Sequence, residues 1–397
     1  LILFWVLVIE FCHPIKSTRN MFKPRNIKQV LNIHKHKRFK LFLSRALSGD
    51  NFQESLDNWS RKKDQFARGS KCILSGIQPT GIPHLGNYIG AIKKWVDLQD
   101  AGTHETILLS IVDLHAITVP QEREIIRENI VGMAACLLAC GVNPSKTILF
   151  QQSTISQHTE LAWILSCLCT MPRLECLPQW KEKSQKYQEP GVGLFIYPIL
   201  QAADILLYKA TEVPVGEDQV HHLELARHLA KAFNRKYGVI FPRPVEIIGE
   251  VNRIKSLRDP NSKMSKSEAN PMGRIELTDS SDEIYEKIKK SVTDFTPHIS
   301  YDSDQRRGVS NLVQIHAALT GQSCQQIVQE SAGLNKVAYK SRLAEIVNET
   351  LAPIRTETAR LLQDKHYISI VLDQGRDKAD MIASKTYSQV KQLVGFS

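Results

Sequence analysis

Short apolar runs alternate with longer amphipathic stretches between residues 71 and 234, and this alternation most limits the folds open to the chain. Four apolar runs have the length and β-branched content of buried strands: 72–76, 106–112, 147–150 and 212–216. Strands that alternate with helices through short connections form parallel sheets with helices on both faces. The sequence therefore predicts an α/β fold with a doubly wound parallel sheet.

In such a sheet, ligands bind beyond the carboxyl ends of the strands. The turns that follow Gly76, Val112 and Val215 are therefore the positions where we expect chemistry. Helical spacing between the strands predicts helices over 87–99, 121–141, 157–170, 195–208 and 218–234.

The pattern changes after residue 271, where strand-like runs become scarce. Helical spacing predicts helices near 281–293, 309–319, 323–331, 336–362 and 374–394. Ser281, followed by Asp282 and Glu283, favours a helix start. We expect three parts: a basic leader and linker over 1–70, a Rossmann-like domain over 71–270, and an all-α domain over 271–397. The last helix could pack back on the Rossmann-like domain.

Positive charge is concentrated near the start of the chain. The formal net charge is +10, from 51 Lys and Arg against 41 Asp and Glu. Residues 11–49 hold ten of these basic residues and no acidic one, and Glu10 is the only acidic residue before them. The remainder is nearly neutral, so any nucleic-acid contact of the folded body must use a local basic patch.

The basic, serine-containing and acid-free composition of 11–49 is typical of a mitochondrial transit segment. A basic arm that stays attached and binds nucleic acid is the alternative. Residues 1–9 are apolar but shorter than the roughly 20 residues of a membrane span. They resemble a secretory signal core, or they are upstream sequence before a true start at Met21. We expect no membrane partner.

The eight cysteines include no two Cys-x-x-Cys pairs at zinc-site spacing. We interpret them as reduced structural thiols of an intracellular compartment and expect no structural metal.

The turn after the first predicted strand carries the first constellation of candidate site residues, Ser75 to Gly90. It contains four glycines, which remove side chains where a base or phosphate must approach the backbone. The helix that follows directs free N–H groups and its positive dipole end toward the same place, which favours phosphate. His84 and Asn87 can add hydrogen bonds to phosphate oxygens.

A second constellation, Lys263-Met264-Ser265-Lys266-Ser267, lies in a polar segment far along the chain. Two lysines flanking Ser265 in a loop suit a clamp on the negative charge that develops on pyrophosphate. A solvated lysine loop is the alternative for this segment alone. Together with the first constellation, it predicts a two-part ATP site.

The two constellations resemble the two signature motifs of class I aminoacyl-tRNA synthetases. From about residue 71 to the C-terminus, the chain also resembles tryptophanyl-tRNA synthetases of the bacterial and mitochondrial type. Five further segments carry this resemblance: Val112–Thr118, Gln179–Ser184, Ala202–Tyr208, Pro214–Gln219 and Arg253–Leu257.

The resemblance implies roles for individual residues. It assigns ATP binding to Gln78, His84, Leu85, Gly86, Asn87, Gly216, Glu217, Asp218, Ile254, Lys263, Met264, Ser265, Lys266 and Ser267. It assigns catalytic roles to His84, Asn87, Lys181, Lys263 and Lys266, of which the lysines would stabilise the α-phosphate transition state and the leaving pyrophosphate. It assigns tryptophan binding to Asp204, His115, Gln78 and Gln219.

The physical chemistry agrees with the role that the resemblance gives to Asp204. A carboxylate that faces an apolar pocket distinguishes tryptophan from phenylalanine, because an analogue without the indole N–H leaves that charge unpaired. A salt-bridged helix acid is the alternative for Asp204, and a structural histidine is the alternative for His115.

The chain departs from the family pattern at two positions. Gln201 replaces the methionine expected before Ala202, which leaves the packing against the indole edge open. Gly86-Asn87 stands where many class I enzymes have Gly-His, and asparagine still supplies a hydrogen-bond donor.

The resemblance implies tryptophan–tRNA ligase activity. Tryptophan and ATP, entering as its Mg²⁺ complex, would form tryptophanyl-adenylate, and the amino acid would then pass to the 3′-terminal ribose of tRNA(Trp). It further implies a homodimer and an anticodon-binding helical domain, and the leader places the enzyme in the mitochondrial matrix, serving translation there. The alternatives are a tyrosyl-tRNA synthetase, an inactive paralogue that binds RNA, and a nucleotidyl transferase that shares only the first motif.

Overall fold

The computed structural model describes residues 66–67, 70–185, 188–216, 219–247, 254–266, 268 and 270–396. All of them belong to one compact unit, Gln65–Ser397. The predicted leader, apart from the last few residues of its linker, lies outside the described residues. Within the described part of the chain, no helix combines the length and the apolar character needed to cross a membrane.

The sheet has five strands in the order β3-β2-β1-β4-β5, and all neighbouring strands pair in parallel. The strands are β1 (Cys72–Ile77), β2 (Thr106–Ile111), β3 (Ile148–Gln151), β4 (Glu212–Pro214) and β5 (Val245–Ile247). This confirms the predicted doubly wound α/β fold. The chain adds β2 and β3 on one side of β1 and then returns to add β4 on the other. The crevice of such a sheet therefore lies beyond the ends of β1 and β4.

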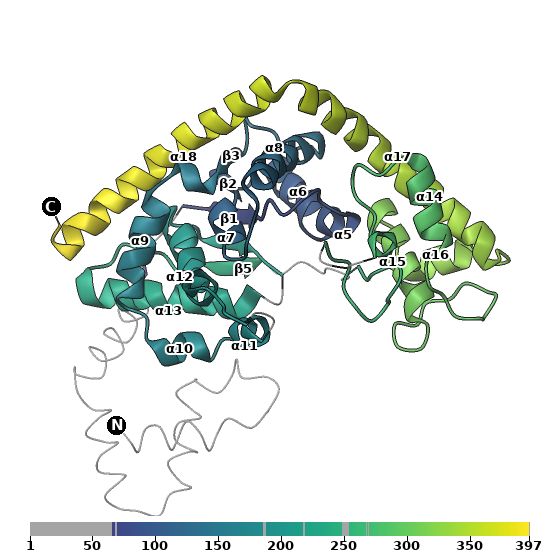
Figure 1. The fold of residues 1–397 in the computed structure, drawn as a ribbon, viewed down its shortest axis with the longest axis horizontal. Helices are drawn as coiled ribbons and strands as arrows, with labels where there is room; N and C mark the ends of the chain where they lie inside the picture. The colour runs from purple at the N-terminus through teal and green to yellow at the C-terminus, as the bar shows by residue number, and fades with distance from the viewer. Residues whose placement is uncertain are drawn as a thin grey trace, which may run out of the picture. The chain divides into compact units, whose positions relative to one another are not determined.

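Helices connect the strands and cover the sheet (Figure 1). Those of this half are α5 (Leu85–Asn87), α6 (Lys93–Ala101), α7 (Asp113–Ala116), α8 (Arg123–Ala139), α9 (Gln157–Ser166), α10 (Met171–Glu175), α11 (Pro178–Ser184), α12 (Val192–Leu207) and α13 (Val220–Tyr237). A π-helical turn, Tyr88–Ile92, joins α5 to α6, so the chain is helical from Leu85 to Ala101.

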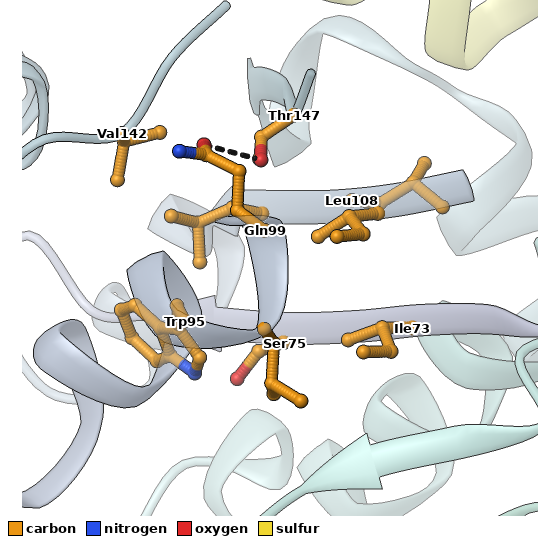
Figure 2. Close-up of a pocket in the computed structure, with 10 residues that line it drawn as sticks. Ile73, Ser75, Trp95, Gln99, Leu108, Val142 and Thr147 are labelled. Atoms are coloured by element: carbon orange, nitrogen blue, oxygen red, sulfur yellow. Dashed lines mark hydrogen bonds between the residues drawn. The ribbon is translucent and has the colours of Figure 1, made fainter. Parts of the chain in front are cut away.

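A small cavity lies between α6 and the sheet (Figure 2). Trp95 and Gln99 of α6 face Ile73 of β1 and Leu108 of β2 across it, and the Gln99 Oε1 accepts a hydrogen bond of 2.8 Å from Thr147 Oγ1. Ser75, the first residue of the first constellation, lines this cavity, but none of the residues that the resemblance assigns to ATP, tryptophan or catalysis does. It is a feature of the helix–sheet core and does not mark the functional site.

The second half of the chain is helical over α14 (Ser281–Lys289), α15 (Arg307–Thr320), α16 (Cys324–Glu330), α17 (Lys336–Gln363) and α18 (Lys365–Val394). Helix α14 begins at Ser281 as predicted, but its cap is the preceding Ser280. The Ser280 hydroxyl accepts a hydrogen bond from the Glu283 N–H, and the Glu283 carboxylate accepts one from the Ser280 N–H. The acid three residues after Ser280 completes this reciprocal cap.

One apolar core joins the two halves of the chain. Leu85 and Ile92 belong to the same buried cluster as Ile284 and Leu351. Helix α17 packs on α8, and α18 runs beside β3, where its inner face enters the second core cluster (Figure 1). A domain boundary at residue 270 stays a prediction, and the buried side chains continue across it.

Candidate active site

His84 caps the helical run that starts directly beyond β1. Its Nδ1 accepts a hydrogen bond of 3.2 Å from the Asn87 N–H, and its own N–H donates to Asn87 Oδ1 at 3.1 Å. This reciprocal pair satisfies backbone donors that the first helical turn would otherwise leave free. Because this run follows β1, its N-terminal end lies on the side of the sheet where β1 ends, and a helix dipole favours an anion at that end.

The imidazole of His84 is neutral near pH 7. Burial, together with the nearby charges of Lys266, Arg274 and Lys263, lowers the pKa of His84 to about 4. Because Nδ1 accepts the Asn87 N–H, the single ring hydrogen lies on Nε2. His84 can therefore donate one hydrogen bond to a ligand, and it does so from Nε2.

The first motif pairs with the chain that follows the lysine loop. Leu85 N donates to Ile275 O at 2.8 Å, and Leu277 N donates to Pro83 O at 2.9 Å. Gly86 lies under Met264, since a Cβ built on Gly86 would come 3.6 Å from the Met264 Cβ and 3.0 Å from His84 Nδ1. The structure thus brings together the two motifs that the sequence places far apart.

Lys266 joins the two motifs directly. Its Nζ donates a hydrogen bond of 2.6 Å to the Gly81 carbonyl oxygen. Burial lowers the pKa of Lys266 to about 8, although Cys136 and Glu276 act in the opposite direction. The pKa of Lys266 is thus close to the pH of the cell, and the lysine lies beside the turn predicted to bind phosphate. Such a lysine is suited to stabilise negative charge that develops on a phosphate.

The lysine loop begins in the second arm of a short hairpin, whose arms are residues 254–256 and 262–264. Met264 N donates to Ile254 O at 3.0 Å, and Ser256 N donates to Ser262 O at 3.0 Å. Lys255 and Lys263 form the antiparallel bridge between these bonds. The hairpin therefore fixes Ile254, one of the predicted ATP-binding residues, relative to the exposed Lys263.

Asp204 lies on α12, 5% exposed, within a cluster of hydrogen-bond donors. His115 Nε2 lies 2.7 Å from Asp204 Oδ2, and His158 Nδ1 lies 2.7 Å from Oδ1. Gln152 Nε2 donates to Oδ1 at 2.8 Å. Burial alone would raise the pKa of Asp204, but the hydrogen bonds and charges of His115 and His158 hold it well below its usual range. The carboxylate is therefore ionised inside the fold.

A second layer supports this carboxylate. His158 Nε2 lies 2.9 Å from the Tyr208 hydroxyl, one turn beyond Asp204 on the chain. The Phe150 ring packs against both His158 and Tyr208. The orientation of His158 is thus fixed at both ring nitrogens.

Gln219 and Gln201 meet at His222. The Oε1 atoms of Gln219 and Gln201 lie 2.8 and 2.9 Å from His222 Nδ1. Tyr197 bonds His222 Nε2 through its hydroxyl at 3.3 Å and packs edge-on against the His115 ring. The glutamine that replaces the expected methionine therefore joins a polar cluster between two predicted tryptophan-binding residues, Gln219 and His115.

Other predicted site residues have weaker structural support. Gln78 and Gly216 are exposed just beyond the ends of β1 and β4, and Lys181 is exposed on α11. Ser265 is half-buried in the lysine loop. Glu217, Asp218 and Ser267 lie outside the described residues. The roles assigned to all of the site residues stay predictions.

The sequence analysis missed several residues around Asp204: Gln152, His158, Tyr208, Tyr197 and His222. Gln152 and His158 follow β3. The rule that chemistry gathers at the carboxyl ends of parallel strands applies to β3 as well, so the turn after residue 150 gave a usable signal. Tyr197 and His222 lie on helices, and Tyr208 directly follows α12; the helical spacing at these positions indicates only burial.

The parallel sheet, the capped turn beyond β1 and the lysine loop joined to it define a class of enzyme. A family model described as class I tRNA synthetases (W and Y) matches residues 68–352. The chain belongs to this family.

Relatives identify the branch of the family. The tryptophan–tRNA ligase of Rickettsia conorii is 44% identical over 329 residues, which cover 82% of this chain and 99% of that protein. The mitochondrial tryptophan–tRNA ligase of Caenorhabditis elegans is 43% identical and is covered over 91% of its length, against 81% of this chain. The structure of tryptophanyl-tRNA synthetase from Campylobacter jejuni, complexed with ADP and tryptophan, matches with a TM-score of 0.70 at 33% identity, covering 82% of this chain and 99% of that one. Within the class, this chain is a tryptophan–tRNA ligase.

Proposed function

We propose that this chain joins L-tryptophan to ATP to give tryptophanyl-adenylate and pyrophosphate, and then transfers the amino acid to tRNA(Trp). The observation that carries the proposal is the contact between the two predicted halves of the ATP site, Lys266 Nζ on the Gly81 carbonyl. A shared ligand accounts for this contact, because it places the charge of Lys266 beside the turn that leads into the helix capped by His84.

In the ATP half, His84 donates from Nε2 to a phosphate oxygen, and the helix that it caps favours the negative charge. Lys263 and Lys266 stabilise the α-phosphate transition state and the leaving pyrophosphate. The hydrogen bond from Lys266 to Gly81 must give way to the phosphate, whose charge raises the pKa of the lysine again. Rate then comes mainly from positioning and charge stabilisation.

In the amino-acid half, the Asp204 carboxylate accepts the indole N–H. Its oxygens already receive hydrogen bonds from His115, His158 and Gln152. The indole N–H therefore competes with His115 at Oδ2, while the other two donors keep the carboxylate ionised and oriented. The ring of phenylalanine has no hydrogen-bond donor to replace the His115 contact at Oδ2. Binding of phenylalanine is therefore unfavourable.

Mg²⁺ enters as part of the substrate, bound to the phosphates of ATP. Among the described residues, no group of three or more His, Cys, Asp and Glu side chains is arranged to hold a metal ion. The donors in the ATP half are lysines, an imidazole and backbone N–H groups, which suit the phosphates themselves.

ATP–pyrophosphate exchange with each of the twenty amino acids tests the proposal. We expect exchange driven by tryptophan, with tyrosine as the alternative outcome for a related synthetase. Lys263→Ala should lower kcat by about 100-fold with a smaller change in the KM for tryptophan, since its contact forms in the transition state. Asp204→Ala should abolish the discrimination against phenylalanine.

Lys146→Ala is the matched control, because it removes an exposed lysine that forms a surface ion pair with Asp100 and belongs to neither motif. Its kinetics should equal those of the wild type. Wild-type protein that binds RNA without any exchange would refute the proposal and support an inactive paralogue.

We also propose that the enzyme acts in the mitochondrial matrix. The acid-free basic stretch over 11–49 supports this, as does the likeness to a mitochondrial ligase, although a bacterial ligase is equally similar. Residues 1–64 fused to a fluorescent protein should carry it into isolated mitochondria and be cleaved there. Retention of the uncleaved fusion outside would contradict the assignment.

We propose, finally, that the enzyme is a homodimer. Three large apolar side chains are exposed on neighbouring elements, namely Trp163 of α9, Met171 of α10 and Val192 of α12. Exposed apolar side chains that gather on one region mark protein contacts. Sedimentation equilibrium should give twice the chain mass, and a monomer at micromolar concentration would refute the proposal.

A further inference from the structure

A side chain from α15 holds the backbone of Lys255 next to the lysine loop. Asn311 Oδ1 accepts a hydrogen bond of 2.8 Å from the Lys255 N–H, and Asn311 Nδ2 donates one of 3.0 Å to the Lys255 carbonyl oxygen. The Asn311 side chain is buried, at 2% exposed. One carboxamide thus makes both hydrogen bonds that a neighbouring strand would make.

The geometry of the hairpin explains why Lys255 needs this partner. Ile254 and Ser256 bond the opposite arm through Met264 and Ser262. In an antiparallel pair, the residue between two such bonds directs its own N–H and C=O outward. Those groups of Lys255 would lack partners, and buried backbone groups without partners are costly. Asn311 lies where the third strand of a sheet would lie.

We propose that Asn311 is a positioning residue for ATP: it sets the place of the hairpin that carries Ile254 and Lys263. This inference rests on the proposed function of that hairpin. The two hydrogen bonds of Asn311 go to the backbone N–H and C=O of Lys255, so Asn311 acts through Lys255, which is bridged to Lys263. A shift of about 1 Å in a group that contacts the transition state can lower the rate about 100-fold. The position of the hairpin therefore determines the rate even when the protein stays folded.

Steady-state exchange with the full chain tests this role through the variant Asn311→Ala. We expect kcat/KM for ATP to fall about tenfold or more, while the KM for tryptophan stays within about twofold. A general loss of structure would change both substrates together. Equal loss for ATP and tryptophan, or no loss, would overturn the inference.

Ser310→Ala is the matched control on the same helix. Ser310 is also 2% exposed, and its hydroxyl likewise bonds both backbone groups of one residue, Asp302. That residue lies outside the hairpin. Ser310→Ala should lower the melting temperature about as much as Asn311→Ala and leave kcat/KM for ATP unchanged.

Asn311→Asp keeps the size of the side chain and the acceptor for the Lys255 N–H. It places a carboxylate oxygen against the Lys255 carbonyl, so the hairpin should shift without a cavity and kcat/KM for ATP should again fall. This variant decides the question if Asn311→Ala does not fold, and wild-type kinetics for Asn311→Asp would overturn the inference.

A double-mutant cycle with Lys263→Ala separates positioning from general support. If Asn311 acts through the Lys255–Lys263 bridge, Asn311→Ala should cost at most about twofold once Lys263 is absent. The same loss in both backgrounds would contradict that path. Wild-type protein without tryptophan-dependent exchange would instead refute the proposed function, so the two failures are distinguishable.

Discussion

His84 has a separate task for each ring nitrogen. Nδ1 caps the helical run by accepting the Asn87 N–H, and Nε2 holds the hydrogen available to a phosphate. A sequence motif that contains histidine does not show this division. The hydrogen bond to Nδ1 fixes the tautomer, and burial keeps the ring neutral.

We predict that two substitutions separate these tasks. His84→Asn keeps an oxygen at the capping position, where asparagine is favoured, and lacks the outer donor. Exchange activity should fall about 100-fold with little change in the melting temperature. His84→Gln should retain more activity, since its amide reaches the place of Nε2, but should lose about 1 kcal/mol of unfolding free energy with the cap.

Exchange kinetics and thermal unfolding of both variants provide the measurement. A glutamine variant that is more stable yet less active than the asparagine variant would reverse the assignment of the two nitrogens.

The lowered pKa of Lys266 predicts that stability and activity change in opposite directions with pH. Its folded pKa of about 8 lies below the value near 10.4 of an exposed lysine, so between these values the unfolded chain holds more protons. The free energy of unfolding contributed by this group should therefore rise with pH across that window. The kcat/KM for ATP should fall above about pH 8, since the free enzyme loses the charge that meets phosphate.

A pH–rate profile of wild type and Lys266→Arg measures the second effect. Arginine keeps its charge throughout the range, so the alkaline decline should disappear whatever the absolute rate of the variant. An unchanged decline in the arginine variant would show that another group titrates.

Helix α18 meets β3 with no room for a side chain at Gly375. A Cβ built there would lie 1.8 Å from the Leu149 carbonyl oxygen, which is a backbone atom of the edge strand. We predict that Gly375→Ala destabilises the protein by about 1–3 kcal/mol or more, because the helix must move away from the strand. Urea denaturation measures this loss.

Gly132 in α8 is the matched control, since nothing lies within 4 Å of a Cβ built there. Gly132→Ala should stabilise the protein by up to about 1 kcal/mol through helix propensity. Similar stabilisation by Gly375→Ala would contradict the close packing of α18 on β3.

For the helices and strands, the periodicity of the sequence predicted the type and order of most elements. It missed β5, whose three residues are too few for a pattern. It began the last helix near 374, whereas α18 begins at Lys365. Isoleucine, valine and tyrosine between 367 and 371 weaken the helical signal there, and the packing of Ile368 and Val371 into the first core cluster overrides it.

For the whole molecule, the sequence predicted both candidate ATP motifs but not how they meet. The pairing of Pro83 and Leu85 with Ile275 and Leu277 joins backbone atoms, which residue identities do not encode. The donors around Asp204 likewise come from two separate segments, one after β2 and one after β3. Local patterns reveal which residues are present, and only the packing of distant elements reveals which of them touch.

The position of α18 has a consequence for how the enzyme is made. A ribosome delivers the chain from its N-terminus, so β3 emerges long before the helix that covers its outer edge. Until α18, Lys365–Val394, has been synthesised, that edge is open to other polypeptides. A nascent chain therefore needs shielding late into translation, and a premature stop codon even within α18 leaves a product with an uncovered sheet and a tendency to aggregate.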